Sequence, residues 1–163
     1  MDTTLSNVKA FHDAFEIESP EQPTLPGHTD KVAEWLDGFA TRMEQLGEDL
    51  HKAAEINGKN VLLLRLQLIQ EELGELARAI ANKDLTETFD ALVDLRYVLD
   101  GTTIALGMGG IFMDGFFEVQ RSNMSKLENG KPLKNEAGRV VKGANYTPPD
   151  MQKFLINPLE QGE

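Results

Sequence analysis

The stretch LLLRLQLIQEELGELARAI, residues 62–80, carries the strongest structural pattern in the chain. Apolar side chains recur in it at alternating steps of four and three, the spacing of one side of an α-helix. They are Leu62, Leu66, Ile69, Leu73, Leu76 and Ile80. Leu63, Leu64 and Leu68 extend the apolar surface well beyond that side. A helix that is apolar nearly all round is buried on several sides, which in a chain of this size indicates a homo-oligomer.

Helical patterns flank this stretch. We expect further helices over residues 6–15, 84–107 and 112–127. Another should begin at Thr29 or Asp30 and end near residue 57, and a break in it at Gly38 or Gly47 stays open. Asp84 caps the helix over 84–107 in our interpretation, as part of a capping box with the residue at 87. The proline-containing loop at 17–28 and the turn-rich segment from 128 are irregular. The prediction is one all-α domain over residues 1–163, a bundle of four or five helices with a C-terminal loop or hairpin.

Composition excludes several classes of protein. The chain has 163 residues, no cysteine and a formal net charge of −11, so disulfides, thiolate nucleophiles and cysteine metal sites are excluded. The negative charge argues against binding to nucleic-acid backbones, which requires a basic surface. No apolar run has membrane-spanning length, and the N-terminal residues lack a signal-peptide pattern, so a cytoplasmic location is expected.

Acidic residues gather on two consecutive predicted helices. Glu72 and Glu75 share a side with Leu68 and Ala79, at about 100° of rotation per residue, so they should face a neighbouring helix. Glu71 lies about opposite the leucine seam. On the next helix, one narrow face carries Glu87, Asp90, Asp94 and Tyr97. Helices joined by a short turn are antiparallel neighbours, so four or five carboxylates can meet there. Oxygen-only ligands suit Mg²⁺ or Mn²⁺, and two ions could share them. The alternative is that these are solvated surface acids.

Basic residues gather after the last predicted helix. Six lie between residues 121 and 142, although the whole chain has 27 acids against 16 bases. They are Arg121, Lys126, Lys131, Lys134, Arg139 and Lys142. A basic segment beside an acidic metal site is what a polyphosphate substrate requires, because metal ions neutralise one side of the phosphates and cations the other. A solvated loop with a chance excess of charge is the alternative.

Two other classes find little support. A di-iron bundle needs two Glu-x-x-His motifs, and the chain offers that form only at Glu48 to His51. The phosphate-loop pattern GxxxxGK[ST] is absent, and GMGG does not match GxGxxG. A helical interaction module without catalysis remains the alternative to an enzyme.

The motifs EELGE, DALVDLRYVLDGT, QRSNMSK and GKPLKNEAGRVVKGANYTPPD together resemble the MazG-like all-α nucleoside triphosphate pyrophosphohydrolase superfamily. Dimeric dUTPases and phosphoribosyl-ATP pyrophosphohydrolase belong to the same superfamily, and the resemblance runs from about Val8 to Met151. It implies water attack on a (deoxy)nucleoside triphosphate that gives the monophosphate and pyrophosphate, for control or cleaning of the nucleotide pool. Phosphoribosyl-ATP hydrolysis is the alternative reaction, and the preferred base and the choice of dimer or tetramer stay open.

The resemblance also implies roles for residues. Glu72, Glu75 and Asp94 would bind Mg²⁺, and Glu71 would add a ligand or activate water, a role that Glu75 could share. Many members carry an acid three residues before the one at 94, where this chain has Ala91, so either Asp90 or Glu87 completes the site. The implied substrate contacts are Asn123, Lys126, Lys142 and Arg121. Aromatic residues that could stack on the base are Tyr97, Phe11 and Phe15.

Overall fold

The computed structural model describes residues 2–58 and 60–155. Its elements are α1 (Thr3–Ala14), α2 (Asp30–Ile56), α3 (Val61–Ala81), α4 (Leu85–Ala105), α5 (Phe112–Met124), β1 (Leu127–Glu128), β2 (Lys131–Pro132) and α6 (Gln152–Leu155). The all-α prediction is confirmed, because the described residues contain, besides the helices, one hairpin of two strands with two residues each.

Short polar side chains set the starts of the first two helices. Asp2 Oδ1 accepts a hydrogen bond from the backbone N–H of Leu5 at 2.8 Å, so α1 begins three residues earlier than predicted. Thr29 Oγ1 accepts from the backbone N–H of Val32 at 3.4 Å, and α2 begins at the next residue, as predicted. α2 continues without a break through Gly38 and Gly47, the two positions at which the sequence allowed an interruption.

Asp84 caps α4, as predicted. Its Oδ1 accepts from the backbone N–H groups of Thr86 at 3.0 Å and Glu87 at 3.1 Å. In a full capping box the Glu87 carboxylate would accept from the N–H of Asp84, but that N–H donates to the carbonyl of Ala79 at 3.0 Å. The backbone N–H of Asp84 is therefore satisfied by the turn after α3 and not by the Glu87 side chain.

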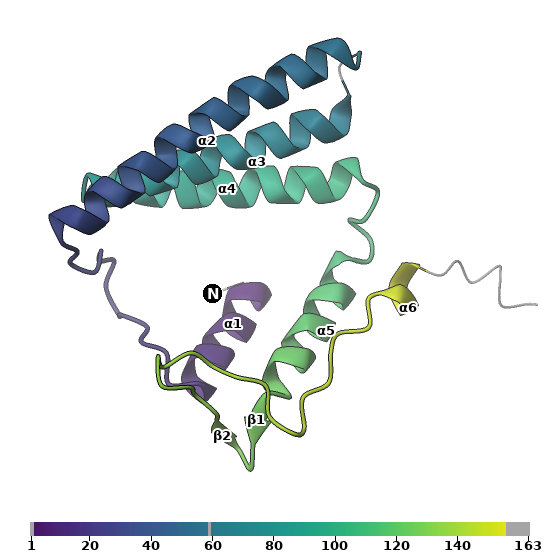
Figure 1. Ribbon diagram of the computed structural model, residues 1–163. Helices are drawn as coiled ribbons and strands as arrows, with labels where there is room; N and C mark the ends of the chain where they lie inside the picture. Colours follow the sequence, from purple (N-terminus) through teal and green to yellow (C-terminus); the bar gives the residue numbers. More distant parts are fainter. Residues whose placement is uncertain (1, 59, 156–163) are drawn as a thin grey trace, which may run out of the picture. The chain divides into compact units, whose positions relative to one another are not determined.

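The chain forms two compact units, and the first holds residues 22–109. In it α3 lies between α2 and α4, with which it packs (Figure 1). The side of α3 that faces α2 is made of small or polar residues. A Cβ built on Gly74 would lie 3.1 Å from Met43 Cβ, and Gln70 Nε2 donates to the Met43 carbonyl, so the two backbones approach closely.

The leucine seam of α3 is only partly covered within the chain, because Ile69, Leu76 and Ile80 are half-buried. Leu62 and Leu66 are each about half exposed, and Leu73 is also exposed. The buried residues of α3 are instead Gln70, Gly74, Ala77 and Ala79. The apolar pattern thus identified the helix correctly, but part of the surface it marks stays exposed.

The other unit holds the described part of residues 1–21 and 110–163. Here α1 lies beside α5 (Figure 1), and Gln120 Nε2 donates to the Asn7 carbonyl at 2.8 Å. The β1–β2 hairpin turns at Asn129 and Gly130, both with positive φ (51° and 75°), as tight two-residue hairpins require. The prediction of one domain over 1–163 stays a prediction, and its ends at residues 1 and 156–163 lie outside the described residues. In the described part, no helix combines the length and apolarity needed to cross a bilayer.

Candidate active site

One predicted metal ligand, Glu72 on α3, lies within the electrostatic influence of the other four. Glu72 is half-buried, and its Oε2 is a buried oxygen without a hydrogen-bond partner. Burial raises the pKa of the Glu72 carboxyl, and the charges of neighbouring carboxylates raise that pKa further. In order of effect these neighbours are Glu75, Asp94, Glu71 and Asp90. The structure therefore brings the five predicted carboxylates into one electrostatic cluster across α3 and α4.

The four neighbours of Glu72 have exposed side chains. Among residues 2–58 and 60–155, no three acidic or histidine side chains stand close enough together to hold a metal ion. The carboxylates therefore influence one another electrostatically, but they do not stand close enough together to coordinate one ion. Carboxylates of like charge on neighbouring helices repel one another, and exposed ones can rotate about their side-chain bonds.

Of the two acids that the sequence left open, Asp90 rather than Glu87 is among the charges that raise the pKa of Glu72. Glu87 instead lines a hollow of about 780 Å³ on the same helical unit. The lining residues come from α2, α3 and the start of α4, and they include Glu71 and Glu75. Glu75 thus lies beside both the hollow and the buried Glu72 carboxyl.

Cations already compensate part of the acidic hollow. Arg78, on α3, donates from Nη1 to Asp37 Oδ1 at 2.6 Å and from Nη2 to Glu44 Oε1, both on α2. Glu71 Oε1 accepts from Gln67 Nε2 at 2.9 Å, one turn earlier on α3. Glu71 therefore presents an exposed carboxylate at the edge of the hollow.

Aromatic residues divide into accessible and inaccessible ones. Tyr97 lies one turn after Asp94 and is 78% exposed, so its ring is open to a ligand. Phe15 is completely buried and stacks on Phe11, with ring centroids 4.2 Å apart. The suggestion that Phe15 contacts a base is therefore wrong, because its ring is part of the core between α1 and its neighbours.

The predicted substrate contacts Asn123, Lys126 and Lys142 lie in the unit that contains α5. Lys126 Nζ donates to Asn123 Oδ1 at 2.8 Å. The Lys142 ammonium lies over the Tyr146 ring, 4.4 Å from its centroid. Each cation is thus oriented by a side chain within four residues of it, and Lys142 remains exposed.

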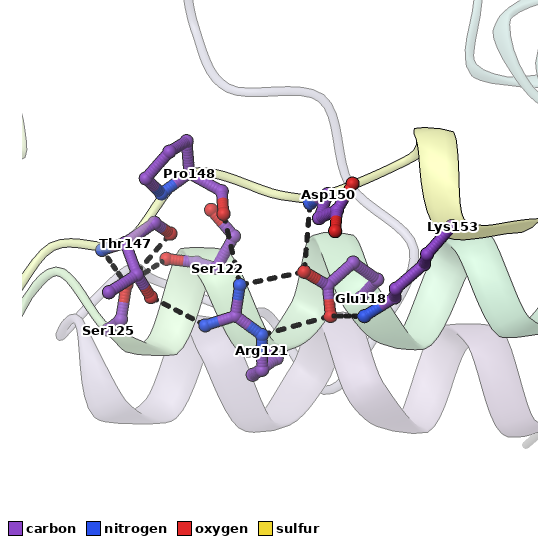
Figure 2. A network of polar contacts seen from close by, with 8 residues as sticks. All are labelled: Glu118, Arg121, Ser122, Ser125, Thr147, Pro148, Asp150 and Lys153. Atoms are coloured by element: carbon purple, nitrogen blue, oxygen red, sulfur yellow. Dashed lines mark hydrogen bonds and ion pairs between the residues drawn. The ribbon is translucent and has the colours of Figure 1, made fainter.

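Arg121 is used differently from the other predicted contacts. Its guanidinium donates to both carboxylate oxygens of Glu118 at 2.9 and 2.7 Å, and also to Thr147 Oγ1 at 2.5 Å and the Pro148 carbonyl at 3.0 Å (Figure 2). Its role as a substrate contact stays a prediction, but most of its donors are already directed at the protein.

Glu118, which no sequence motif singled out, is only 6% exposed. It accepts hydrogen bonds from Arg121, the backbone N–H of Asp150 at 2.9 Å and Lys153 Nζ at 3.0 Å. These bonds, that from Arg121 first, hold the pKa of the Glu118 carboxyl well below its usual range. The spacing of three between Glu118 and Arg121 on a helix was the available signal, since such pairs are neighbours on the helix surface.

Comparison with known proteins points to one family. The sequence model of the family described as phosphoribosyl-ATP pyrophosphohydrolase matches residues 32–123, which is more than half of the chain. The fold is similar to a crystal structure of a "putative NTP pyrophosphohydrolase" from Exiguobacterium sp. 255-15, with a TM-score of 0.55, 24% identity and 98% of each chain covered. A comparison with curated proteins gives no match.

Proposed function

The chain belongs to the phosphoribosyl-ATP pyrophosphohydrolase family of MazG-like all-α enzymes, and we propose that it hydrolyses a (deoxy)nucleoside triphosphate to the monophosphate and pyrophosphate with Mg²⁺. Membership of that family makes it a hydrolase of nucleotide pyrophosphate bonds. The choice of substrate and metal is the proposal, and the cluster of carboxylates around Glu72 supports it most directly.

The oxygen ligands of these carboxylates are of the kind that a hard divalent cation prefers. Glu72 Oε2 is buried without a partner, and an oxygen in that state is stabilised by a nearby positive charge. Glu72, Glu75 and Asp94 would hold the metal, with Asp90 and Glu71 as further ligands, and the number of carboxylates suits two Mg²⁺ or Mn²⁺ ions. Such an ion, when bound, polarises phosphate oxygens and lowers the pKa of its water.

The remaining steps fall to the side chains of this chain. Glu71, at the edge of the hollow, would accept the proton of the attacking water, and Glu75 could share that role. Asn123, Lys126 and Lys142 would hold the phosphates, with Arg121 as a further contact, because cations offset the charge that the reaction spreads over the phosphate oxygens. Tyr97, largely exposed, would stack on the base.

A second copy of the chain would cover the leucine seam. Leu62, Leu66 and Leu73 form an exposed apolar row on α3, and a row of this kind favours association through the same surface on each copy. A homodimer or homotetramer is the proposed assembly. Light scattering of the wild-type chain should give twice or four times the monomer mass, and Leu66→Glu should shift it toward the monomer. A monomeric wild type would refute this part.

Phosphoribosyl-ATP is the second candidate substrate, because the matching family is described by its hydrolysis. The same carboxylates and cations would serve either reaction, since both release pyrophosphate from a nucleotide. A comparison of the two substrates separates the candidates.

The experiment is a panel of canonical and modified nucleoside triphosphates with phosphoribosyl-ATP, in which pyrophosphate release is measured with and without Mg²⁺. We expect release to require the metal, and Glu75→Gln and Asp94→Asn each to abolish it while the helical circular dichroism is kept. Glu34→Gln, an exposed acid on α2, is the matched control and should retain wild-type rates. Full activity in Glu75→Gln or Asp94→Asn would refute the site. A chain that gains no thermal stability from Mg²⁺ and binds no nucleotide would instead be a helical interaction module.

A further inference from the structure

Glu118 joins two parts of the chain that are distant in sequence. It lies in the middle of α5, and its carboxylate is almost fully buried. The donors around it come from α5 itself through Arg121 and from the C-terminal segment through Asp150 and Lys153 (Figure 2). A carboxylate is the only side-chain group that can accept all of these bonds at once, because it has two acceptor oxygens and no donor.

The same carboxylate orders Arg121, which extends the connection. Arg121 is held in a two-point contact with Glu118 and reaches Thr147 and Pro148 with its remaining bonds. Ser125 Oγ, one turn further along α5, accepts from the backbone N–H of Thr147 at 2.9 Å. Residues 147–153 are thereby fastened along α5 at successive points (Figure 2).

Lys142 lies just before the fastened segment, and a second carboxylate fixes its neighbours. Glu128 Oε1 accepts from the backbone N–H of Ala144. A Cβ built on Gly143 would lie 2.7 Å from Glu128 Cγ, so only glycine allows this approach. The segment that carries Lys142 is therefore held by Glu128 on one side and by the Glu118 network on the other.

We propose that Glu118 is a positioning residue for the phosphate-binding side chains. It fastens the segment 147–153 to α5 and so fixes Lys142 relative to Asn123 and Lys126, which α5 and its end carry. The inference rests on the proposed function, because it takes these three residues as contacts of the phosphates. Glu118 itself is almost fully buried, and its carboxylate is occupied by Arg121, Asp150 and Lys153.

Replacing Glu118 with glutamine tests this. The amide keeps the size of the side chain but turns one acceptor into a donor that faces Arg121 or Lys153, which are donors only. The C-terminal segment should then open more often, and trypsin should cleave after Lys142 several-fold faster than in the wild type. The KM for the substrate should rise roughly tenfold with kcat within about twofold, since binding contacts are lost and the carboxylates at the reaction are untouched.

Three variants complete the experiment. Glu136→Gln makes the same change of charge at an exposed position of the same unit and should behave as the wild type. Thr147→Val removes one outer contact of Arg121 without disturbing the buried carboxylate, and should shift KM in the same direction by a smaller factor if Glu118→Gln does not fold. The double variant Glu118→Gln/Lys142→Ala should have the KM of Lys142→Ala alone, because a residue that acts through Lys142 has no effect once Lys142 is gone.

The outcomes separate the two proposals. An active wild type in which Glu118→Gln matches Glu136→Gln, or in which its effect multiplies with that of Lys142→Ala, would refute the positioning role alone. A fall in kcat at constant KM would also refute it. A wild type that releases no pyrophosphate from any substrate would refute the proposed function and, with it, the positioning role.

Discussion

Gly47 on α2 provides a test of how α2 and α3 are packed. It is buried, and a Cβ built on it would lie 2.5 Å from Gln70 Oε1 and 3.3 Å from Gln70 Cδ. Gln70 is 7% exposed, and its amide also donates to the Met43 carbonyl. The hydrogen bond to Met43 therefore holds the amide in place, and the methyl group added in Gly47→Ala should displace it.

The magnitude follows from three opposing effects. Alanine favours the helical state over glycine by about 1 kcal/mol. Overpacking of a close contact costs about 1–3 kcal/mol, and loss of the Gln70–Met43 hydrogen bond costs about 1 kcal/mol. The expected net loss in the free energy of unfolding is about 2 kcal/mol, which for a chain of this length lowers Tm by roughly 4–8 °C.

Gly38, on the same helix, is the matched control. A Cβ built there meets Arg42 Nη1 at 3.6 Å, an ordinary contact. Gly38→Ala should therefore stabilise the chain by up to about 1 kcal/mol. Thermal and urea unfolding followed by far-ultraviolet circular dichroism measure both variants. If Gly47→Ala is as stable as Gly38→Ala, the close approach of α2 and α3 at Gln70 is refuted.

Two further predictions concern the charged groups. Glu72→Gln should raise the free energy of unfolding of the metal-free chain, measured with urea, by up to about 1 kcal/mol, because it removes a half-buried charge that four carboxylates repel. An unchanged free energy of unfolding, with Glu34→Gln as the control, would count against the cluster. The lowered pKa of Glu118 means that its charged form stabilises the folded state, fully above the unfolded pKa near 4.5 and progressively less as the pH falls below it. Urea unfolding from about pH 6 to about pH 3 should therefore show the wild type losing its advantage over Glu118→Gln, whereas a difference independent of pH would contradict this origin of the effect.

Local sequence signals predicted most of the helices because the physical causes are themselves local. Asp84 caps α4 with its own side chain, and the proline-rich loop before α2 and the Asn129–Gly130 turn fall where backbone preferences place them. The start of α1 was missed because Asp2, rather than a residue nearer the predicted start, provides the cap. Helix ends depend on one hydrogen bond, so a single unrecognised cap moves them by several residues.

The acidic cluster was also predictable in outline. The periodicity of α3 placed Glu72 and Glu75 on the side of Ala79, and Ala79 is buried while Glu72 is half-buried and surrounded by the predicted partners. Periodicity could not choose between Glu87 and Asp90, because both lie on one face of α4. The approach of each to Glu72 depends on the register of two helices, which no local pattern records.

The amino-acid order alone determined where the helices lie and which residues share a side of each, since spacing and caps act within a few residues. Folding in three dimensions settled that α3 packs on α2 through Gly74 and Gln70 while Leu66 stays open, because hydrophobic pattern does not distinguish a surface covered within the chain from one left exposed. It also settled the role of Glu118, whose partners come from about thirty residues further along the chain. A buried carboxylate requires hydrogen-bond donors, and these can come from any part of the chain that folding brings next to it. The sequence pattern around Glu118 therefore does not identify them.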